Sequence, residues 1–146
     1  MLSQLRVAEL LAAIGERTPA PASGAATAVT GALGAALAEL ASRFAGDEDA
    51  AVRAHELALE LVQLGDADAV AYEAFIAERT EESRAEIIRI PTQIASHADE
   101  VVAIALRAAD RLRSSVVGDA EAGAELARAA ARVARGLAEL NRASAS

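Results

Sequence analysis

The sequence predicts an all-α protein, an antiparallel bundle of about five helices. Apolar residues recur at helical spacing along most of the chain, and no stretch of useful length alternates as a strand would. Hydrophobic residues make up 53% of the 146 positions, yet only two are Phe and one is Tyr. The core is therefore expected to consist of closely approaching helices that carry Ala, Leu and Val. A chain of this length fits one domain over residues 1–146, large enough to bury a core.

Glycine and proline mark the limits of the first two predicted helices. The first helix runs from about Gln4 to Ile14 and is followed by Gly15. The second begins after Pro21 and continues to Phe44. Gly46 then interrupts the pattern, and Asp47 is a candidate N-cap for the next helix.

Two long helices follow, and each contains one residue that disfavours a straight helix. The third runs from about Glu48 to Arg79, with Gly65 as a candidate bend. The fourth covers roughly Glu81 to Arg113 and contains Pro91. A proline at this position either kinks the helix or opens a new helix at its first turn.

The last predicted helix runs from Asp119 to about Asn141. Asp119 follows Gly118, so it is a candidate N-cap and also a polar group that points toward a site. The tail over residues 142–146 is expected to be frayed.

Charge and composition exclude several classes of function. The formal net charge of −8 argues against a nucleic-acid partner, which needs a basic patch. The absence of cysteine excludes disulfide and thiolate chemistry. The first segment carries charges and lacks the continuous apolar core of a signal peptide, so we expect a cytoplasmic protein. The uncharged stretch from Thr18 to Ala38 has the length of a membrane span. It is rich in Ala and Gly rather than large apolar residues, which favours a helix buried in protein over a membrane helix.

The second helix carries small residues all around its circumference, including Gly31 and Gly34. Glycine inside a helix costs about 1 kcal/mol relative to alanine, so a compensating role is expected. Two roles fit: a central helix or dimer seam packed tightly on its neighbours, or a flat surface for a planar ligand.

An aspartate on the inward face of the third helix is the best candidate for chemistry. At about 100° per residue, Asp68 shares a stripe with leucines and with Tyr72 and Phe75, whereas Asp66 projects from the opposite side and is expected to be solvated. A buried carboxylate must be paired, hydrogen-bonded or placed in a cleft. Asp68 is therefore either a structural group, bonded for example to Tyr72, or a general acid whose pKa is raised by desolvation.

Other polar residues give weaker signals. His55 and His97 have no second ligand at metal spacing, so no metal site is predicted and both histidines are expected to be exposed. Arg128, Arg132 and Arg135 form a basic stripe along the last helix, which favours a solvated, salt-bridged face over a site for an anionic tail.

Four motifs occur in an order that is typical of one family. A turn over residues 18–25 reads TPAPASGA where the family has T-P-x-P-G-G-G-S, and the small-residue helix follows it. Residues 66–72 read DADAVAY, close to the family's D-x-D-A-x-A-F, and residues 90–95 read IPTQIA in place of V-P-L-E-x-A. Residues 118–120 read GDA, where the family has a turn that ends in S-D-A. Over most of its length the chain resembles the cyclodeaminase/cyclohydrolase family, which contains the cyclodeaminase half of formiminotransferase-cyclodeaminase and methenyltetrahydrofolate cyclohydrolases.

The resemblance implies an all-helical homodimer with its folate site near the subunit interface. It implies a tetrahydrofolate derivative as substrate, with no tightly bound cofactor. Asp68 falls on the family's aspartate and is expected to be the acid/base, with Asp119 as a second catalytic residue. Pro21, Ser23 and Gly24 are expected to form the ligand turn, and Tyr72 to contact the substrate.

Two alternatives stay open. The family chemistry is either deamination of a formiminotetrahydrofolate or hydrolysis of a methenyltetrahydrofolate. Ala22, Ser23 and Ala25 replace motif glycines and a serine, which also fits a divergent non-catalytic homodimer that binds a ligand or a protein partner.

Overall fold

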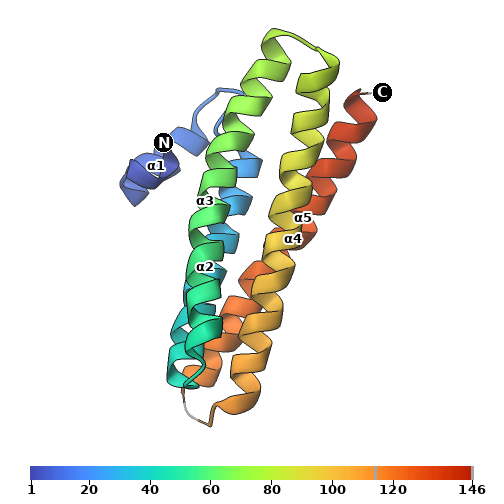
Figure 1. The fold of residues 1–146 in the computed structure, drawn as a ribbon. Helices are drawn as coiled ribbons and strands as arrows, with labels where there is room; N and C mark the ends of the chain where they lie inside the picture. The colour runs from blue at the N-terminus through green and yellow to red at the C-terminus, as the bar shows by residue number, and fades with distance from the viewer. Residues whose placement is uncertain (114, 146) are drawn as a thin grey trace.

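The computed structural model describes residues 1–113 and 115–145, and every regular element in this part of the chain is helical. A 3-10 helix, η1 (Leu2–Gln4), precedes α1 (Val7–Gly15). Four long helices follow, which are α2 (Ser23–Phe44), α3 (Glu48–Ala77), α4 (Glu81–Arg111) and α5 (Val116–Ala145). The predicted all-α class with five α-helices is thus confirmed over the described residues (Figure 1).

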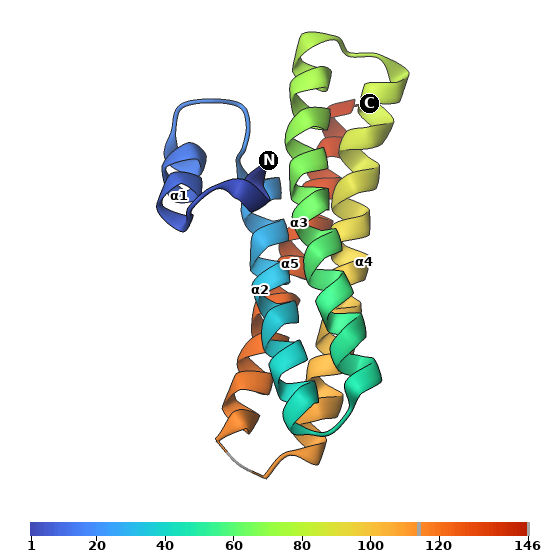
Figure 2. The ribbon, with the colours of Figure 1, turned by 60° about the vertical axis from the view of Figure 1, so that its left-hand side comes forward.

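The four long helices form an antiparallel bundle in which the chain reverses at each connection (Figures 1 and 2). Helices α2 and α4 each pack against the other three long helices. The start of α2, the end of α3 and the end of α5 lie toward one end of the bundle (Figure 1). The opposite end holds the end of α2 and the start of α5, where Ala41, Ala108 and Ala120 pack together.

Small residues let the backbone of α2 approach its neighbours. A Cβ atom added to Gly34 would lie 2.9 Å from the carbonyl oxygen of Gly123, and one added to Gly123 would lie 3.0 Å from that of Gly34. Helices α2 and α5 are therefore in backbone contact here, and any larger side chain would separate them. This close packing offsets the roughly 1 kcal/mol that a glycine costs inside a helix.

Helix α2 has the length and composition of a membrane span but is a core helix in this fold. It is 22 residues long, its most apolar window has a mean hydropathy of 1.3, and 56% of that window is buried inside the bundle. Neighbouring helices bury the apolar surface of α2, as lipid would bury the surface of a membrane helix. The burial agrees with the expectation of a helix surrounded by protein.

Helix α1 stands apart from the bundle (Figure 2). It has no buried residue, and Val7 and Leu11 are 75% and 65% exposed. The segment is attached through η1, because Leu2 is buried and its N–H donates a 2.6 Å hydrogen bond to Oδ1 of Asp66.

Some helix limits differ from the predictions. Asp47 caps α3 as expected, with its side chain accepting from the N–H of Ala50 at 3.1 Å. Helix α4 is one continuous element through Pro91, which is buried. The prediction that Asp119 is an N-cap is wrong, because α5 begins at Val116 and places Asp119 within its first turn. The predicted fraying is wrong for residues 142–145, which belong to α5, while Ser146 lies outside the described residues.

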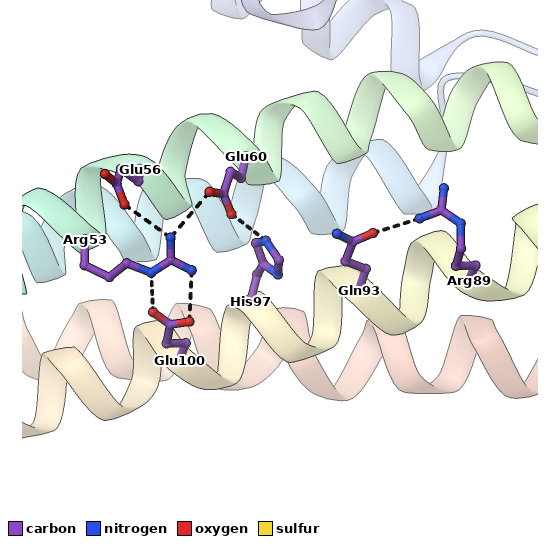
Figure 3. Close-up of polar contacts among 7 residues, drawn as sticks. All are labelled: Arg53, Glu56, Glu60, Arg89, Gln93, His97 and Glu100. Carbon is purple, nitrogen blue, oxygen red and sulfur yellow. Dashed lines mark hydrogen bonds and ion pairs between the residues drawn. The ribbon is translucent and has the colours of Figure 1, made fainter.

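Helices α3 and α4 are joined along their middle by a polar network (Figure 3). The guanidinium of Arg53 makes two hydrogen bonds to the carboxylate of Glu100, at 2.5 and 3.0 Å. It also lies 3.3 Å from Glu56 and 3.4 Å from Glu60. Nε2 of His97 lies 2.6 Å from Glu60, and the side chain of His97 is only 17% exposed. The prediction that both histidines are exposed is therefore wrong for His97.

Candidate active site

The carboxylate of Asp68 lies directly against the first turn of α2. A Cβ atom placed on Gly24 would lie 1.9 Å from Oδ2 of Asp68 and 2.3 Å from its Cγ. Only glycine fits at position 24 while Asp68 keeps this position. The contact joins the two motifs that the sequence analysis singled out, the turn before α2 and the aspartate of α3.

Asp68 has no hydrogen bond or ion pair with any residue in the described part of the chain. Its bond to Tyr72, one of the structural roles considered from the sequence, is therefore absent from the described contacts. Burial raises the pKa of the Asp68 carboxyl above its ordinary value, because a charged carboxylate is poorly solvated there. A half-buried carboxyl group with a raised pKa is a candidate for giving and taking a proton.

The first turn of α2 supplies polar backbone groups beside this carboxyl. The N-cap is Ala22, which has no side chain able to cap the helix, so the N–H groups of Ser23 and Gly24 have no partner inside the helix. The positive end of the helix dipole also points toward this region. Ser23 is exposed and Gly24 is buried. The turn therefore presents hydrogen-bond donors at the edge of the site.

These residues border a cavity of about 230 Å³. Helix α3 contributes Asp68 and Tyr72, the loop and start of α2 contribute Ser23 and Gly24, and α5 contributes Asn141. The remaining lining residues are Pro19, Ala20, Ala22, Leu137 and Leu140. The cavity thus combines an acid, a phenol and a carboxamide with an apolar wall.

Four of the six site residues expected from the sequence meet at this cavity, and two do not. Pro21 faces an adjoining cavity of about 280 Å³, which it shares with Leu2 and Asp66. Asp119 lies at the other end of the bundle. Asn141, which borders the Asp68 cavity, is 22 residues further along the same helix, a distance of roughly 33 Å at the helical rise. Asp119 and Asp68 of one chain therefore do not share a cleft.

The prediction of a solvated Asp66 is wrong. Its Oδ1 accepts the hydrogen bond from Leu2, and its Oδ2 is buried without a partner in the described part of the chain. Asp66 anchors the N-terminal segment on α3, whereas Asp68 faces the cavity. The two motif aspartates thus have different structural roles.

A larger cavity of about 530 Å³ lies between the end of α3 and the start of α4. Its apolar lining residues include Val70, Ala71 and Ile90. Four acidic residues also line it, Asp66, Glu78, Glu82 and Glu86, and no lysine, arginine or histidine is among its lining residues. These acidic residues disfavour an anionic ligand in this cavity.

Asn141 is the site residue that the sequence analysis missed. It was placed at the end of the last helix, before a frayed tail, and no motif contains it. Its position four residues after Leu137 on an apolar face was a signal, as was its status as the only asparagine of the chain. No cluster of three or more His, Asp or Glu side chains able to hold a metal ion occurs among the described residues.

The fold matches that of an enzyme of known structure. The crystal structure of formiminotetrahydrofolate cyclodeaminase from Thermotoga maritima has a TM-score of 0.89 to this chain, at 21% sequence identity. The match covers 99% of this chain and 81% of the other. The two proteins thus share one class of helical fold. No curated protein sequence matches the chain.

The family assignment rests on sequence. The family model described as formiminotransferase-cyclodeaminase matches residues 6–146, which is nearly the whole chain. The chain therefore belongs to the formiminotransferase-cyclodeaminase family, and the predicted resemblance is confirmed.

Proposed function

We propose that this protein is an enzyme of folate one-carbon metabolism that acts on a tetrahydrofolate derivative at the Asp68 cavity. The observation that carries the proposal is the unpaired Asp68 carboxyl pressed against Gly24, because it joins an acid/base group to the ligand turn of the family. Family membership supports the substrate class. The substrate arrives and leaves with each turnover, and no tightly bound cofactor takes part.

Asp68 moves the protons in this mechanism. In the cyclodeaminase reaction, N10 of 5-formiminotetrahydrofolate attacks the formimino carbon, the carbon–nitrogen bond to the amino group breaks, and ammonia leaves. The Asp68 carboxylate takes the proton from N10, and the carboxylic acid gives a proton to the departing nitrogen. In the cyclohydrolase reaction the same group takes a proton from the water that adds to the methenyl carbon. It then gives a proton to the ring nitrogen whose bond to that carbon breaks as the ring opens. A raised pKa lets one carboxyl group do both.

The size of the cavity favours binding of the reacting part of the folate alone. Cavities that enclose a whole drug-sized ligand measure about 300–1,000 Å³, whereas this one measures about 230 Å³. Tyr72 and the wall formed by Leu137 and Leu140 suit a flat ring. The rest of the substrate would extend across the mouth of the cavity, where Leu140 is 65% exposed.

Turnover of both substrates by matched variants tests the proposal. Asp68→Asn keeps the shape of the side chain and removes its acid, so we expect turnover to fall by about 100-fold or more. Glu100→Gln, on α4 in the network around Arg53, is the control and is expected to keep full turnover. Full activity of Asp68→Asn would contradict the acid/base role. If the unaltered protein gave no heat on titration with folate derivatives, the non-catalytic alternative would replace the proposal.

The protein is further proposed to work in the cytoplasm as a homodimer that uses the outer face of α2 and α5. Leu33, Leu40 and Phe44 of α2 are 57%, 39% and 65% exposed, and Val133 of α5 is 45% exposed. These residues follow each other at helical spacing, on two helices in direct contact. Exposed apolar patches of this kind mark interfaces, and a two-fold dimer pairs such a face with itself.

This dimer would also account for Asp119. Asp119, Leu126, Val133 and Leu140 succeed each other at steps of seven residues, so they lie on one face of α5. Leu140 borders the Asp68 cavity, at the other end of that face. A two-fold axis perpendicular to the bundle would place Asp119 of the partner subunit beside the Asp68 cavity. Each site would then be completed by both copies.

Subunit mixing tests the shared site. Asp68→Asn and Asp119→Asn proteins are each expected to be nearly inactive. Mixed and allowed to exchange subunits, they are expected to recover about a quarter of normal activity, because half of the dimers are mixed and each mixed dimer has one intact site. Activity that does not recover in mixed dimers, shown to form by differential tagging, would contradict a site shared in this way.

A further inference from the structure

Pro91 leaves one carbonyl group of α4 without its helical donor. Proline has no N–H, so the carbonyl oxygen four residues earlier, that of Ile87, receives no hydrogen bond from position 91. Ile87 and Pro91 are both buried, so water does not readily replace the missing donor. A buried carbonyl without a partner is costly, and helices with internal prolines need a substitute donor.

Asn141 of α5 supplies that donor. Its Nδ2 donates a 2.7 Å hydrogen bond to the carbonyl oxygen of Ile87. The bond joins residues 54 positions apart in the sequence. It is the only hydrogen bond of Asn141 to a side chain or carbonyl of another helix within the described residues.

The same carboxamide borders the Asp68 cavity. One N–H of its planar amide is held by Ile87, so the rotation of the group is restricted. This leaves Oδ1 as an acceptor and the second N–H as a donor, neither of which has a partner among the described residues. A fixed, unsatisfied carboxamide at the edge of a half-buried cavity is suited to recognising a ligand.

We propose that Asn141 is a substrate-binding residue and that Pro91 is the residue that positions it. This proposal rests on the proposed function and deepens it. A carboxamide presents an acceptor and a donor side by side, which matches the edge of a ring that carries an N–H next to an acceptor. In the Asp68 cavity the group that Asn141 recognises is the polar edge of a pteridine ring. Pro91 acts from outside the cavity, since it does not line it.

Two variants separate the binding role from a structural one. Asn141→Ala removes the carboxamide and leaves the Ile87 carbonyl without a partner. Pro91→Ala restores an N–H that pairs with the Ile87 carbonyl inside α4 and so releases the carboxamide of Asn141. Because alanine is far more favourable than proline inside a helix, Pro91→Ala is expected to keep the Tm or to raise it. If Asn141 served only to stabilise the fold, Pro91→Ala would lower neither the Tm nor the affinity for the ligand.

Binding of 5-formyltetrahydrofolate, a non-reacting analogue, is measured by isothermal titration calorimetry together with the Tm. Asn141→Ala is expected to lower the Tm by about 3 °C and to raise the Kd by about 10-fold. Pro91→Ala is expected to raise the Kd by about 3- to 10-fold without a loss of Tm. The double variant is expected to bind no more weakly than Asn141→Ala, because both changes act through one amide. Gln93→Ala, which removes a carboxamide of α4 that bonds Arg89, is the control and is expected to leave the Kd unchanged.

The outcomes distinguish this inference from the proposed function. If the unaltered protein binds the analogue and both variants bind it equally well, the assignment of Asn141 is overturned while the folate site stands. Strictly additive losses in the double variant would also overturn it, because Pro91 would then act independently of Asn141. If the unaltered protein does not bind the analogue, both the proposed function and this inference are overturned.

Discussion

Glu60 and Asp68 lie two turns apart on α3, and their carboxylates have opposite surroundings. Glu60 lies within hydrogen-bond distance of both Arg53 and His97, in a network that extends to Glu100 on α4 (Figure 3). Asp68 meets the backbone of Gly24 and has no polar partner among the described residues. The Arg53 guanidinium, through its hydrogen bonds, holds the pKa of Glu100 below its ordinary value, whereas burial raises the pKa of Asp68.

This difference separates the carboxylates of the network from the Asp68 carboxyl group. Arg53 lowers the pKa of Glu100, and the network ties α3 to α4, so it serves the fold. Asp68 has no cation that would hold it in its charged form, and it borders a cavity. Helix α3 thus carries carboxylates of the network and a separate half-buried carboxyl group, whose surroundings suit the proposed acid/base role of Asp68.

Among changes that leave Asp68 itself in place, the largest expected effect comes from its neighbour Gly24. Gly24→Ala would put a methyl group where the Asp68 carboxylate lies, so the carboxylate must move. Turnover of the folate substrate is expected to fall by about 100-fold, because a displaced acid no longer reaches the reacting nitrogen. Gly15→Ala is the control, since a Cβ atom at Gly15 meets nothing within 4 Å. Equal turnover by the Gly24 and Gly15 variants would show that the close contact is irrelevant to catalysis.

A smaller effect is expected on the pH dependence of stability, with opposite signs in the two regions. The folded-state pKa of Glu100 is lowered, so its stabilising effect is present above its unfolded pKa and is lost as the pH falls through the folded value. Glu100→Gln should therefore lower the free energy of unfolding at pH 7, by less than about 1 kcal/mol because the pair is partly exposed.

The sign reverses for Asp68. Its folded-state pKa is raised, so the folded protein loses stability as the pH rises from the unfolded pKa, near 4, through the folded value. Asp68→Asn should therefore raise the free energy of unfolding at pH 7, and the gain should vanish below about pH 4. Urea unfolding of both variants at pH 4 and pH 7 measures the two differences. A loss of stability at pH 7 in Asp68→Asn would mean that the carboxylate has a stabilising partner.

Much of the fold was predictable because its signals are local. Helical periodicity gave the five helices, and the cap at Asp47 formed as its sequence context predicts. The failure at Asp119 has a physical reason, since a favourable capping sequence does not prevent a helix from starting one turn earlier. The inward face of α3 was also predictable, because Leu57, Leu61 and Phe75 are buried as the stripe requires.

The site was predictable only where its residues lie in local motifs. Asp68 and Gly24 were each identifiable, but their contact depends on the packing of α2 against α3. Asp66 was misjudged because its partner, the N–H of Leu2, lies 64 residues away. Asn141 was missed for the same reason, since its role depends on the carbonyl of Ile87 on another helix.

Titration of the Asp68 carboxyl group tests the central claim most directly. Carbon-13 NMR of aspartate-labelled protein, with Asp68→Asn to assign the resonance, reports the pKa of this group in the folded state. The unpaired, half-buried carboxyl is predicted to titrate above the ordinary aspartate value of about 3.9. A midpoint at or below that value would mean that Asp68 is held as a carboxylate, like Glu100, and would contradict its assignment as the acid/base.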